Sequence, residues 1–457
     1  MTPLASFDVN AVLEQSQLQV DALQGEALQR MLKLCAKGHP FYQREWAREG
    51  IDIESIRSTN DIAALPLTLK SKLMREPEAF RLNVTDLPLE ERALAEVIYT
   101  TGSTSAPTPI YNTTHDIQGY MFQARRVAAI SGLNETDVIA NLFPLTAAPM
   151  GAFQRSSQNA MAVGASIVAT LPGAPFGEFG MQRSLDEAVR LIELHKATIV
   201  WGVTSFVRRI LLRALKLESD FSHIRMCAVS GEASTTALRQ ELRQLMQKLG
   251  AAGTIVFDRY GSTELGGLAQ CREEGDWHNP APGLQFLEIV DPDTGRQLPT
   301  GERGTLALTH LNRRGTVLVR FVVGDIVSLA LGPCPHCGRA GERVVGPVVR
   351  SKDLVKIKGM LVNPAVLLDV LDKIDNILEY QVIIQKSESE DEFSMDEMLI
   401  RVATNVVDQK LIGTQVIGAA AAAIGVRPRV VFVRANKIFD PNKQAKAVRL
   451  IDRRLAV

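Results

Sequence analysis

The fold is decided between residues 137 and 203, where short β-rich runs alternate with polar stretches. The β-rich runs are DVIANLF (137–143), ASIVATL (165–171) and ATIVWGV (197–203), and SLDEAVRLIELH (184–195) between the last two has helical spacing. Strands that alternate with helical patterns are typical of βαβ units. The segment therefore predicts an α/β fold class, in which a mostly parallel sheet carries helices on its faces.

The same alternation extends outward in both directions. Upstream, EVIYTT (96–101) precedes the helical stretch THDIQGYMFQARRVAAI (114–130), and residues 9–37 carry Leu and Val at helical spacing. Downstream, a helix is expected at 236–250. It is followed by strand-like runs, the later ones shorter and punctuated by Gly and Pro, at 253–261, 285–291, 304–311 and 326–331.

A turn-like stretch, GPVVRSKDLVKIKG (346–359), separates this part from a compact tail of helix-like and strand-like runs. We place a domain boundary near Arg350. The sequence thus predicts a large N-terminal domain, 1–350, with mostly parallel sheets flanked by helices, and a small α+β C-terminal domain, 351–457.

The composition is typical of a globular protein with a hydrophobic core. The 457 residues have a net charge of zero and 46% are hydrophobic, without the one-sided basic run that nucleic-acid or anionic-membrane binding needs. The first twenty residues have no basic segment before an apolar one, and the apolar run 416–426 is shorter than the roughly 20 residues of a spanning helix. We therefore expect a cytoplasmic enzyme, with no nucleic acid or membrane as partner and a homodimer left open.

Three segments contain residue types suited to binding a nucleotide. In TTGSTSAPTPI (100–110), hydroxyls and a glycine can present donors to phosphate oxygens. In FDRYGSTELGG (257–267), Tyr260 can stack on a base, Thr263 can bond a phosphate and Glu264 can hold Mg²⁺. In VRFVVGDIV (319–327), the carboxylate of Asp325 suits a ribose diol. Each segment alone is equally compatible with a surface turn.

Taken in order, five segments resemble the adenylate-forming superfamily, and most closely its phenylacetate–CoA ligase branch. They are TTGSTSAPT, YGSTE, RFVVGD, VRSKD followed by LVKIKG, and QAKAVRLIDRR. The resemblance extends from about Ala95 to the C-terminus. It implies ATP, Mg²⁺ and CoA as cosubstrates and cofactor, and a mobile C-terminal domain that carries the catalytic lysine.

The resemblance also assigns roles to single residues. It implies that Tyr260 and Gly261 lie against the adenine, that Thr263 and Glu264 act at the phosphates and Mg²⁺, and that Asp325 and Arg350 hold the ribose. The phosphates would be cradled by Thr101, Gly102, Ser103 and Thr104. The segment CAVSGEAST places Gly231 and Glu232 in an adenine-side loop. The acid pocket would include Phe143, Trp201 and Val203, although each of these apolar residues could equally belong to the core.

The last segment contains two lysines, Lys443 and Lys446. Matching Arg449, Ile451 and Asp452 to the family's RVID places Lys446 at the catalytic position. Its role would be to hold the acyl carboxylate and the α-phosphate oxygens as pyrophosphate leaves. The resemblance further implies that Lys352 is the hinge, and that Lys358 and Gly359 line the thiol tunnel for the second half-reaction.

The phosphate loop departs from the family's pattern at two positions. Ser105 replaces the usual second glycine and Ala106 the usual lysine, which restricts the backbone and removes a positive charge. ATP binding is therefore expected to be weaker. A non-catalytic nucleotide- or acyl-binding paralogue is the second hypothesis.

Cysteine and histidine supply a further set of ligands. Cys271, His278, Cys334 and Cys337 form a Cys₃His set with a C-x-x-C pair, which tetrahedral Zn²⁺ accepts, and His336 inside that pair is a competing ligand. The alternative is a turn with two reduced cysteines. A metal here would brace the strands beyond YGSTE.

The expected reaction has two steps. ATP and a carboxylic acid give an acyl-adenylate and pyrophosphate, and the thiol of CoA then gives a thioester and AMP. An aryl or arylacetic acid is favoured only because of the branch that the chain resembles. A carrier-protein thiol or an amine could replace CoA.

Overall fold

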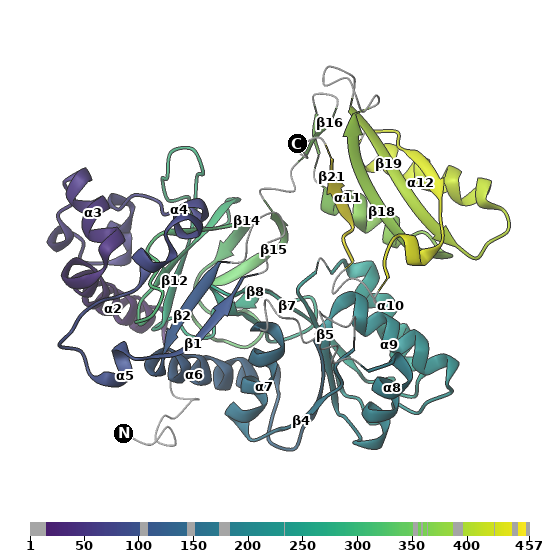
Figure 1. Cartoon of the computed structure of the whole chain (residues 1–457), viewed down its shortest axis with the longest axis horizontal. Helices are drawn as coiled ribbons and strands as arrows, with labels where there is room; N and C mark the ends of the chain where they lie inside the picture. Colours follow the sequence, from purple (N-terminus) through teal and green to yellow (C-terminus); the bar gives the residue numbers. More distant parts are fainter. Residues whose placement is uncertain are drawn as a thin grey trace. The chain divides into compact units, whose positions relative to one another are not determined.

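The computed structural model groups the chain into two compact units (Figure 1). The first contains residues 1–139, 146–167 and 257–348, and the second contains 140–145, 168–256 and 349–457. The structure describes residues 15–100, 108–143, 151–172, 183–232, 234–350, 355–357, 360–362, 364–386, 396–424, 426–440 and 447–453.

Two N-terminal helices form one wall of the first unit's core. Helix α2 (Gln17–Gly38) begins at a capping box, in which Ser16 and Gln19 bond each other's backbone N–H groups. Helix α3 (Pro40–Glu49) begins after His39. Both bury apolar residues in a cluster with the segment that precedes and opens β14, including Leu28, Met31, Leu32, Phe41, Val317 and Phe321. The predicted amphipathic helices are confirmed from Gln17 onward.

A parallel sheet lies at the centre of the predicted βαβ region. Its order is β4-β3-β5-β6-β7, and β5 pairs parallel with β6. The strands are β3 (Val138–Leu142), β4 (Ser166–Ala169), β5 (Ile199–Val203), β6 (Met226–Ser230) and β7 (Ile255–Arg259). Every residue of β5 is buried, as expected for a strand covered on both faces. The α/β class is confirmed.

Helices of the second unit flank this sheet, namely α8 (Leu185–Leu194), α9 (Thr204–Lys216) and α10 (Thr236–Lys248). Helices α6 (Thr114–Ser131) and α7 (Gly151–Val163) belong to the first unit and pack against each other. Helices α8, α9 and α10 pack side by side (Figure 1). A hairpin of β1 (Leu94–Tyr99) and β2 (Pro109–Thr113) precedes α6. Short elements connect the N-terminal region: η2 (Ile53–Ser55), η3 (Thr59–Ala64), α4 (Lys70–Arg75), η4 (Pro77–Phe80) and α5 (Leu89–Arg92).

The first unit also contains a six-stranded sheet in the order β10-β11-β15-β14-β13-β12. Its strands are β10 (Ala269–Gln270), β11 (Trp277–His278), β12 (Gln285–Val290), β13 (Gly304–His310), β14 (Phe321–Ala330) and β15 (Arg343–Arg350). Neighbours β10–β11, β11–β15, β12–β13 and β13–β14 pair antiparallel. The prediction of mostly parallel sheets does not extend to this one, since these strand pairs are antiparallel.

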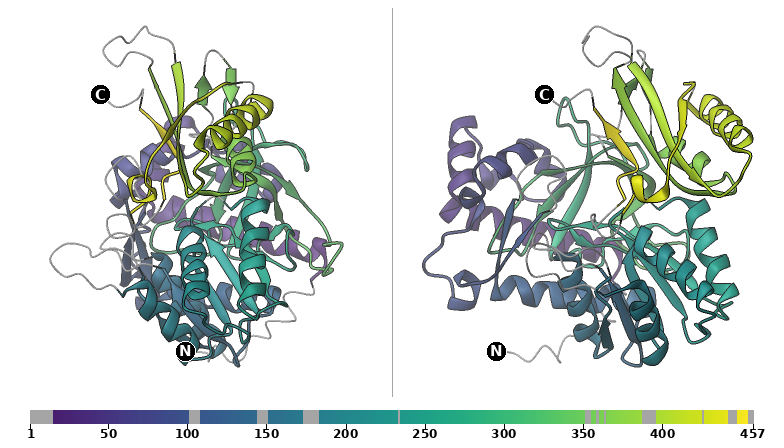
Figure 2. Two further views of the ribbon diagram at one scale, coloured as in Figure 1. Left: turned by 90° about the vertical axis from the view of Figure 1, so that its right-hand side faces the viewer. Right: turned by 45° about the vertical axis from the view of Figure 1, so that its right-hand side comes forward.

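The C-terminal residues form an α+β arrangement within the second unit. A four-stranded sheet has the order β20-β19-β18-β21, with β18–β19 antiparallel and β18–β21 and β19–β20 parallel. The elements are β16 (Val355–Ile357), β17 (Met360–Val362), α11 (Pro364–Asp372), β18 (Ile377–Lys386), β19 (Asp396–Thr404), α12 (Gln409–Ile424), β20 (Arg429–Phe432), η6 (Ala435–Lys437) and β21 (Leu450–Asp452). Helices α11 and α12 cover one face of the sheet (Figure 2). The predicted α+β tail is confirmed.

The boundary predicted near Arg350 falls next to Val349, where the last segment of the second unit begins. Because residues 168–256 also belong to that unit, the division into domains 1–350 and 351–457 stays a prediction. Within the described part of the chain, each helix is too short or too polar to cross a membrane.

Candidate functional site

The YGSTELGG segment folds into a tight hairpin. Strand β8 (Gly261–Ser262) pairs antiparallel with β9 (Gly266–Gly267). Residue 261 must be glycine, because a Cβ atom there would collide with the carbonyl oxygen of Gly266. Gly266 itself has φ +73°, and the Ser262 Oγ accepts a hydrogen bond from the Leu265 N–H at 3.1 Å. These features place Thr263 and Glu264 in the turn.

A buried histidine holds the backbone of this turn. Burial lowers the pKa of His310 to about 3, so the ring is neutral. Its Nδ1 accepts from the Leu318 N–H at 3.2 Å, and its Nε2 therefore carries the proton and donates to the carbonyl oxygen of Glu264 at 2.9 Å. The imidazole thus fixes the position from which the Glu264 side chain extends.

Tyr260 and Asp325 meet although they are distant in the sequence. The Tyr260 hydroxyl donates to Asp325 Oδ2 at 2.6 Å, and the Tyr260 ring lies 5.7 Å from the Trp277 ring, centroid to centroid. Asp325 follows Gly324, whose φ is +94°, and the pairing of β13 with β14 is irregular there. A glycine at a bulge explains the GD pair, since the left-handed residue re-aims the side chain that follows.

The carboxylate of Glu264 forms an ion pair. Its Oε1 lies 2.9 Å from Lys70 Nζ, and the side chains are 3% and 37% exposed. Lys70 is the first residue of α4. A carboxylate this buried needs a partner cation, and oxygen is the ligand that Mg²⁺ prefers. Glu264 therefore suits Mg²⁺ chemically, and the lysine adds a second positive charge at the same carboxylate.

The predicted acid-pocket residues lie together in the second unit. The rings of Phe143 and Trp201 form a T-shaped pair with centroids 6.2 Å apart, and Val203 lies two residues beyond Trp201 on β5. Alternate residues of a strand share one face. All three side chains are buried.

Gly231 and Glu232 form the turn after β6. Gly231 has φ +79°, and the Glu232 carboxylate accepts from both the backbone N–H and the hydroxyl of Ser205, each at 2.9 Å. The predicted adenine-side loop is therefore joined to the first turn of α9.

Several predicted site residues lie outside the described residues. They are Thr101, Gly102, Ser103, Thr104, Lys352, Lys358, Gly359 and Lys446. Arg350 is described only as the backbone end of β15. Their roles stay predictions.

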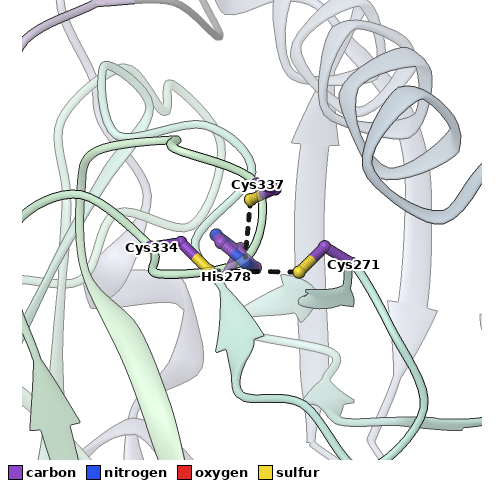
Figure 3. Close-up of side chains that lie close together, drawn as sticks. All are labelled: Cys271, His278, Cys334 and Cys337. Atoms are coloured by element: carbon purple, nitrogen blue, oxygen red, sulfur yellow. Dashed lines mark hydrogen bonds between the residues drawn. The ribbon is translucent and has the colours of Figure 1, made fainter.

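The four predicted metal ligands converge on one point (Figure 3). The ligand atoms of Cys271, His278, Cys334 and Cys337 all lie within 4.8 Å of one another. Cys271 Sγ is 4.0 Å from Cys334 Sγ, and Cys337 Sγ is 3.7 Å from His278 Nε2. Tetrahedral Zn²⁺ with bonds of about 2.0–2.3 Å would place its ligand atoms roughly 3.5–3.8 Å apart. His336 is exposed, and the group contains His278 instead.

The surroundings of the cluster shift the pKa values of three of its four ligands. Burial lowers the pKa of His278 to about 4, which leaves the imidazole neutral. Burial and the neighbouring thiols raise the pKa of Cys271 to about 12. At Cys334 burial is outweighed by the N–H groups of His336 and Cys337, which lower the pKa. The donor set, its spacing and its burial fit Zn²⁺.

The cluster joins segments that carry the nucleotide residues. Cys271 directly follows β10 and His278 ends β11, in the hairpin after the YGSTE hairpin, and Cys334 and Cys337 lie between β14 and β15. Strand β14 also carries Asp325. A metal ion would therefore fix the YGSTE hairpin relative to the GD strand.

Lys70 and His310 were missed by the sequence reasoning. Neither lies in a recognisable motif, and each reaches Glu264 through a long-range contact. Nothing in the sequence around Ser205 indicated that this residue would bind Glu232.

Comparison with known proteins agrees with this geometry. Residues 9–311 match the family described as AMP-binding enzyme. Phenylacetate-coenzyme A ligase of Thermus thermophilus is 25% identical over 426 residues, 92% of this chain and 89% of that protein. The Escherichia coli enzyme of the same name is 23% identical over 447 residues, 95% of each chain.

Among solved structures, 2-hydroxyisobutyryl-CoA ligase in the postadenylation state has a TM-score of 0.79 at 21% identity, covering 99% of this chain and 94% of that one. The similarity to a solved ligase thus extends over nearly the whole chain. The chain belongs to the AMP-binding enzyme family, and within this adenylate-forming superfamily it resembles the phenylacetate–CoA ligase branch.

Proposed function

We propose that the chain is an AMP-forming carboxylate–CoA ligase that acts on an aryl or arylacetic acid. One observation carries most of the weight. The hairpin at 260–267 brings Tyr260, hydrogen-bonded to Asp325, within four residues of the buried carboxylate of Glu264. To bind a nucleoside triphosphate, a site needs an aromatic ring that contacts the base, an acceptor for the ribose hydroxyls and a carboxylate that binds the cation.

In the first step a carboxylate oxygen of the acid attacks the α-phosphorus of ATP and pyrophosphate leaves. Tyr260 and Gly261 would lie against the adenine, with Gly231 and Glu232 as the adenine-side loop. Asp325 would accept the ribose hydroxyls, because a carboxylate accepts several hydrogen bonds and can keep the one from Tyr260. Arg350 would contribute to the ribose from the end of β15. Orientation and charge neutralisation supply most of the rate in such a step.

Positive charge at the phosphates would come from several sources. Mg²⁺ supplies neutralisation of phosphate charge when bound, and Glu264 would hold it. Thr263 and the segment 101–104 would donate to phosphate oxygens, and Lys446 would hold the α-phosphate and acyl oxygens. Lys70, at 2.9 Å from Glu264, supplies a point charge that the altered phosphate loop has lost at Ala106.

In the second step the thiol of CoA attacks the acyl carbon and AMP leaves. Lys352 would be the hinge for this change, and Lys358 and Gly359 would line the thiol path. The buried Phe143–Trp201 pair and Val203 favour an aryl or arylacetic acid over a polar one. A carrier-protein thiol remains the alternative acceptor.

We further propose that Cys271, His278, Cys334 and Cys337 hold a structural Zn²⁺. The test is metal analysis of the purified protein, with about one zinc per chain expected. His278→Ala should lose the metal and lower the melting temperature, whereas His336→Ala, at the exposed neighbouring histidine, should change neither. Full zinc content in His278→Ala would reject the site.

The enzymatic proposal is tested by carboxylate-dependent ATP–pyrophosphate exchange across aryl, arylacetic and short fatty acids, followed by AMP release with and without CoA. Exchange with one class of acid would identify the substrate class, and CoA-dependent AMP release would identify CoA as the acyl acceptor. Lys446→Ala should lower exchange roughly a hundred- to a thousandfold. Intact ATP binding without exchange by any acid would favour the non-catalytic paralogue that Ser105 and Ala106 suggest.

A further inference from the structure

Glu232 is fixed by the N-terminus of a helix. Its Oε2 accepts from the backbone N–H of Ser205 and its Oε1 accepts from the hydroxyl of the same residue, both at 2.9 Å. The residue that precedes helix α9, Val203, has no side-chain oxygen to cap it. A carboxylate at this end satisfies a helix N–H group and interacts favourably with the helix dipole. The side chain of Glu232 is therefore held in one orientation.

The same carboxylate reaches the segment that follows the predicted catalytic lysine. The backbone N–H of Ala447 donates to Glu232 Oε1 at 3.0 Å, and Ala447 is the residue directly after Lys446. The next two residues are held by strand β18 instead. The Val448 carbonyl accepts from Gln381, and the Arg449 carbonyl accepts from the Val382 N–H at 2.8 Å.

These contacts have different consequences. The Arg449 carbonyl joins the backbone bonds between β18 and β21, whereas the Val448 carbonyl is held by the Gln381 side chain of β18. The Ala447 bond builds no sheet, and it ties the backbone beside Lys446 to the turn after β6. A lysine side chain has four flexible carbons, so its ammonium is well aimed only when the backbone that carries it is fixed.

We propose that Glu232 is a positioning residue that aligns Lys446 for adenylation by holding the N–H of Ala447. This inference rests on the proposed ligase function and deepens it. Lys446 serves the first half-reaction, whereas the segment around Lys358 and Gly359 serves the second. Loss of the Glu232–Ala447 bond therefore slows formation of the acyl-adenylate more than it slows conversion of the acyl-adenylate to the thioester.

The half-reactions are measured separately on the full-length protein. ATP–pyrophosphate exchange, with the acid that exchanges fastest in the panel, reports adenylation. Thioester formation from the synthetic acyl-adenylate of the same acid plus CoA reports the second step. Glu232→Ala should lower kcat for exchange about 10- to 100-fold, the range expected for a hydrogen bond to a charged acceptor, with KM for ATP little changed.

Two further variants separate positioning from a purely structural role. Glu232→Gln retains an acceptor oxygen and should recover most of the exchange rate. Ala447→Pro removes the donor N–H and leaves the contacts of Glu232 with Ser205 in place, so it carries the test should Glu232→Ala not fold. The double variant with Ala447→Pro and Glu232→Ala should lower kcat for exchange by no more than the larger of the two single effects.

Equal losses in both half-reactions would overturn the proposal, because they indicate a general structural defect. A raised KM for ATP with normal kcat would also overturn it, since that result would leave Glu232 a role in the adenine-side loop alone. Absence of exchange in the unmodified protein would reject the proposed function, and this role of Glu232 with it.

Discussion

Two ion pairs of the first unit differ in how far solvent reaches them. Glu288 and Arg320 are each 1% exposed, and the guanidinium donates to both carboxylate oxygens and also to the carbonyls of Leu65 and Gly295. Glu264 is nearly as buried as Glu288, but its partner Lys70 is 37% exposed and forms one bond to it, at 2.9 Å.

We interpret the Glu288–Arg320 pair as structural and propose that the Glu264–Lys70 pair is available to a ligand. Burial raises the pKa of Glu288, although Arg320 opposes the shift. The buried carboxylate therefore depends on the Arg320 guanidinium as its partner. Lys70 reaches Glu264 from the solvent side and can turn toward a phosphate or make room for a metal ion. The RFVVGD segment contains both Arg320 and Asp325, yet only the aspartate contacts a predicted nucleotide residue.

The largest effect is expected when the buried Glu288–Arg320 ion pair is broken. Arg320→Met leaves Glu288 buried without its partner and should cost about 3–5 kcal/mol of unfolding free energy. The double variant Arg320→Met with Glu288→Leu removes both charges and should recover most of that loss. Urea unfolding with a constant m-value measures both. A double variant as unstable as the single one would show that the loss comes from packing and not from the stranded charge.

An intermediate effect is expected at the Lys70–Glu264 pair, mainly on activity. Lys70→Met removes the point charge and should lower kcat/KM for ATP about 10- to 100-fold. It also leaves a buried carboxylate unpaired, which should cost about 1–3 kcal/mol of unfolding free energy, less than Arg320→Met. Lys72→Met is the matched control, because Lys72 lies on the same helix and pairs with the buried Glu45 at 2.8 Å.

The control variant Lys72→Met should leave kcat/KM for ATP unchanged. Equal kinetics for the Lys70 and Lys72 variants would assign the Lys70–Glu264 pair to structure, and the contrast between the two ion pairs would then disappear.

Structural features that are confined to a short segment could be predicted from the sequence. The βαβ alternation, the strand before YGSTE and the Cys₃His set were all recognisable, because hydrophobic period and ligand type are local properties. The four Cys and His ligand atoms converge and the rings of Phe143 and Trp201 lie together, while the roles of these residues stay predictions.

Contacts between distant segments could not be predicted in the same way. Lys70 and His310 reach Glu264 from residues 194 and 46 positions away, through side chains that no pattern distinguishes from other buried or surface ones. The antiparallel sheet was also missed, since short apolar runs fit either sheet type until their connections are known.

The smallest effect is expected from the hydrogen bond between Tyr260 and Asp325. Tyr260→Phe keeps the ring that would lie against the adenine and removes the hydroxyl that orients the carboxylate at 2.6 Å. Because the hydroxyl acts on ATP only through the carboxylate that it orients, we expect a net loss of about 0.5–1.5 kcal/mol in ATP binding, so KM for ATP should rise roughly 3- to 10-fold while kcat changes little. Asp325→Asn should raise KM further, because the ribose then loses its charged acceptor. If Tyr260→Phe weakened ATP binding more than Asp325→Asn, the tyrosine hydroxyl itself would contact the nucleotide, and the aspartate would only hold the tyrosine in place.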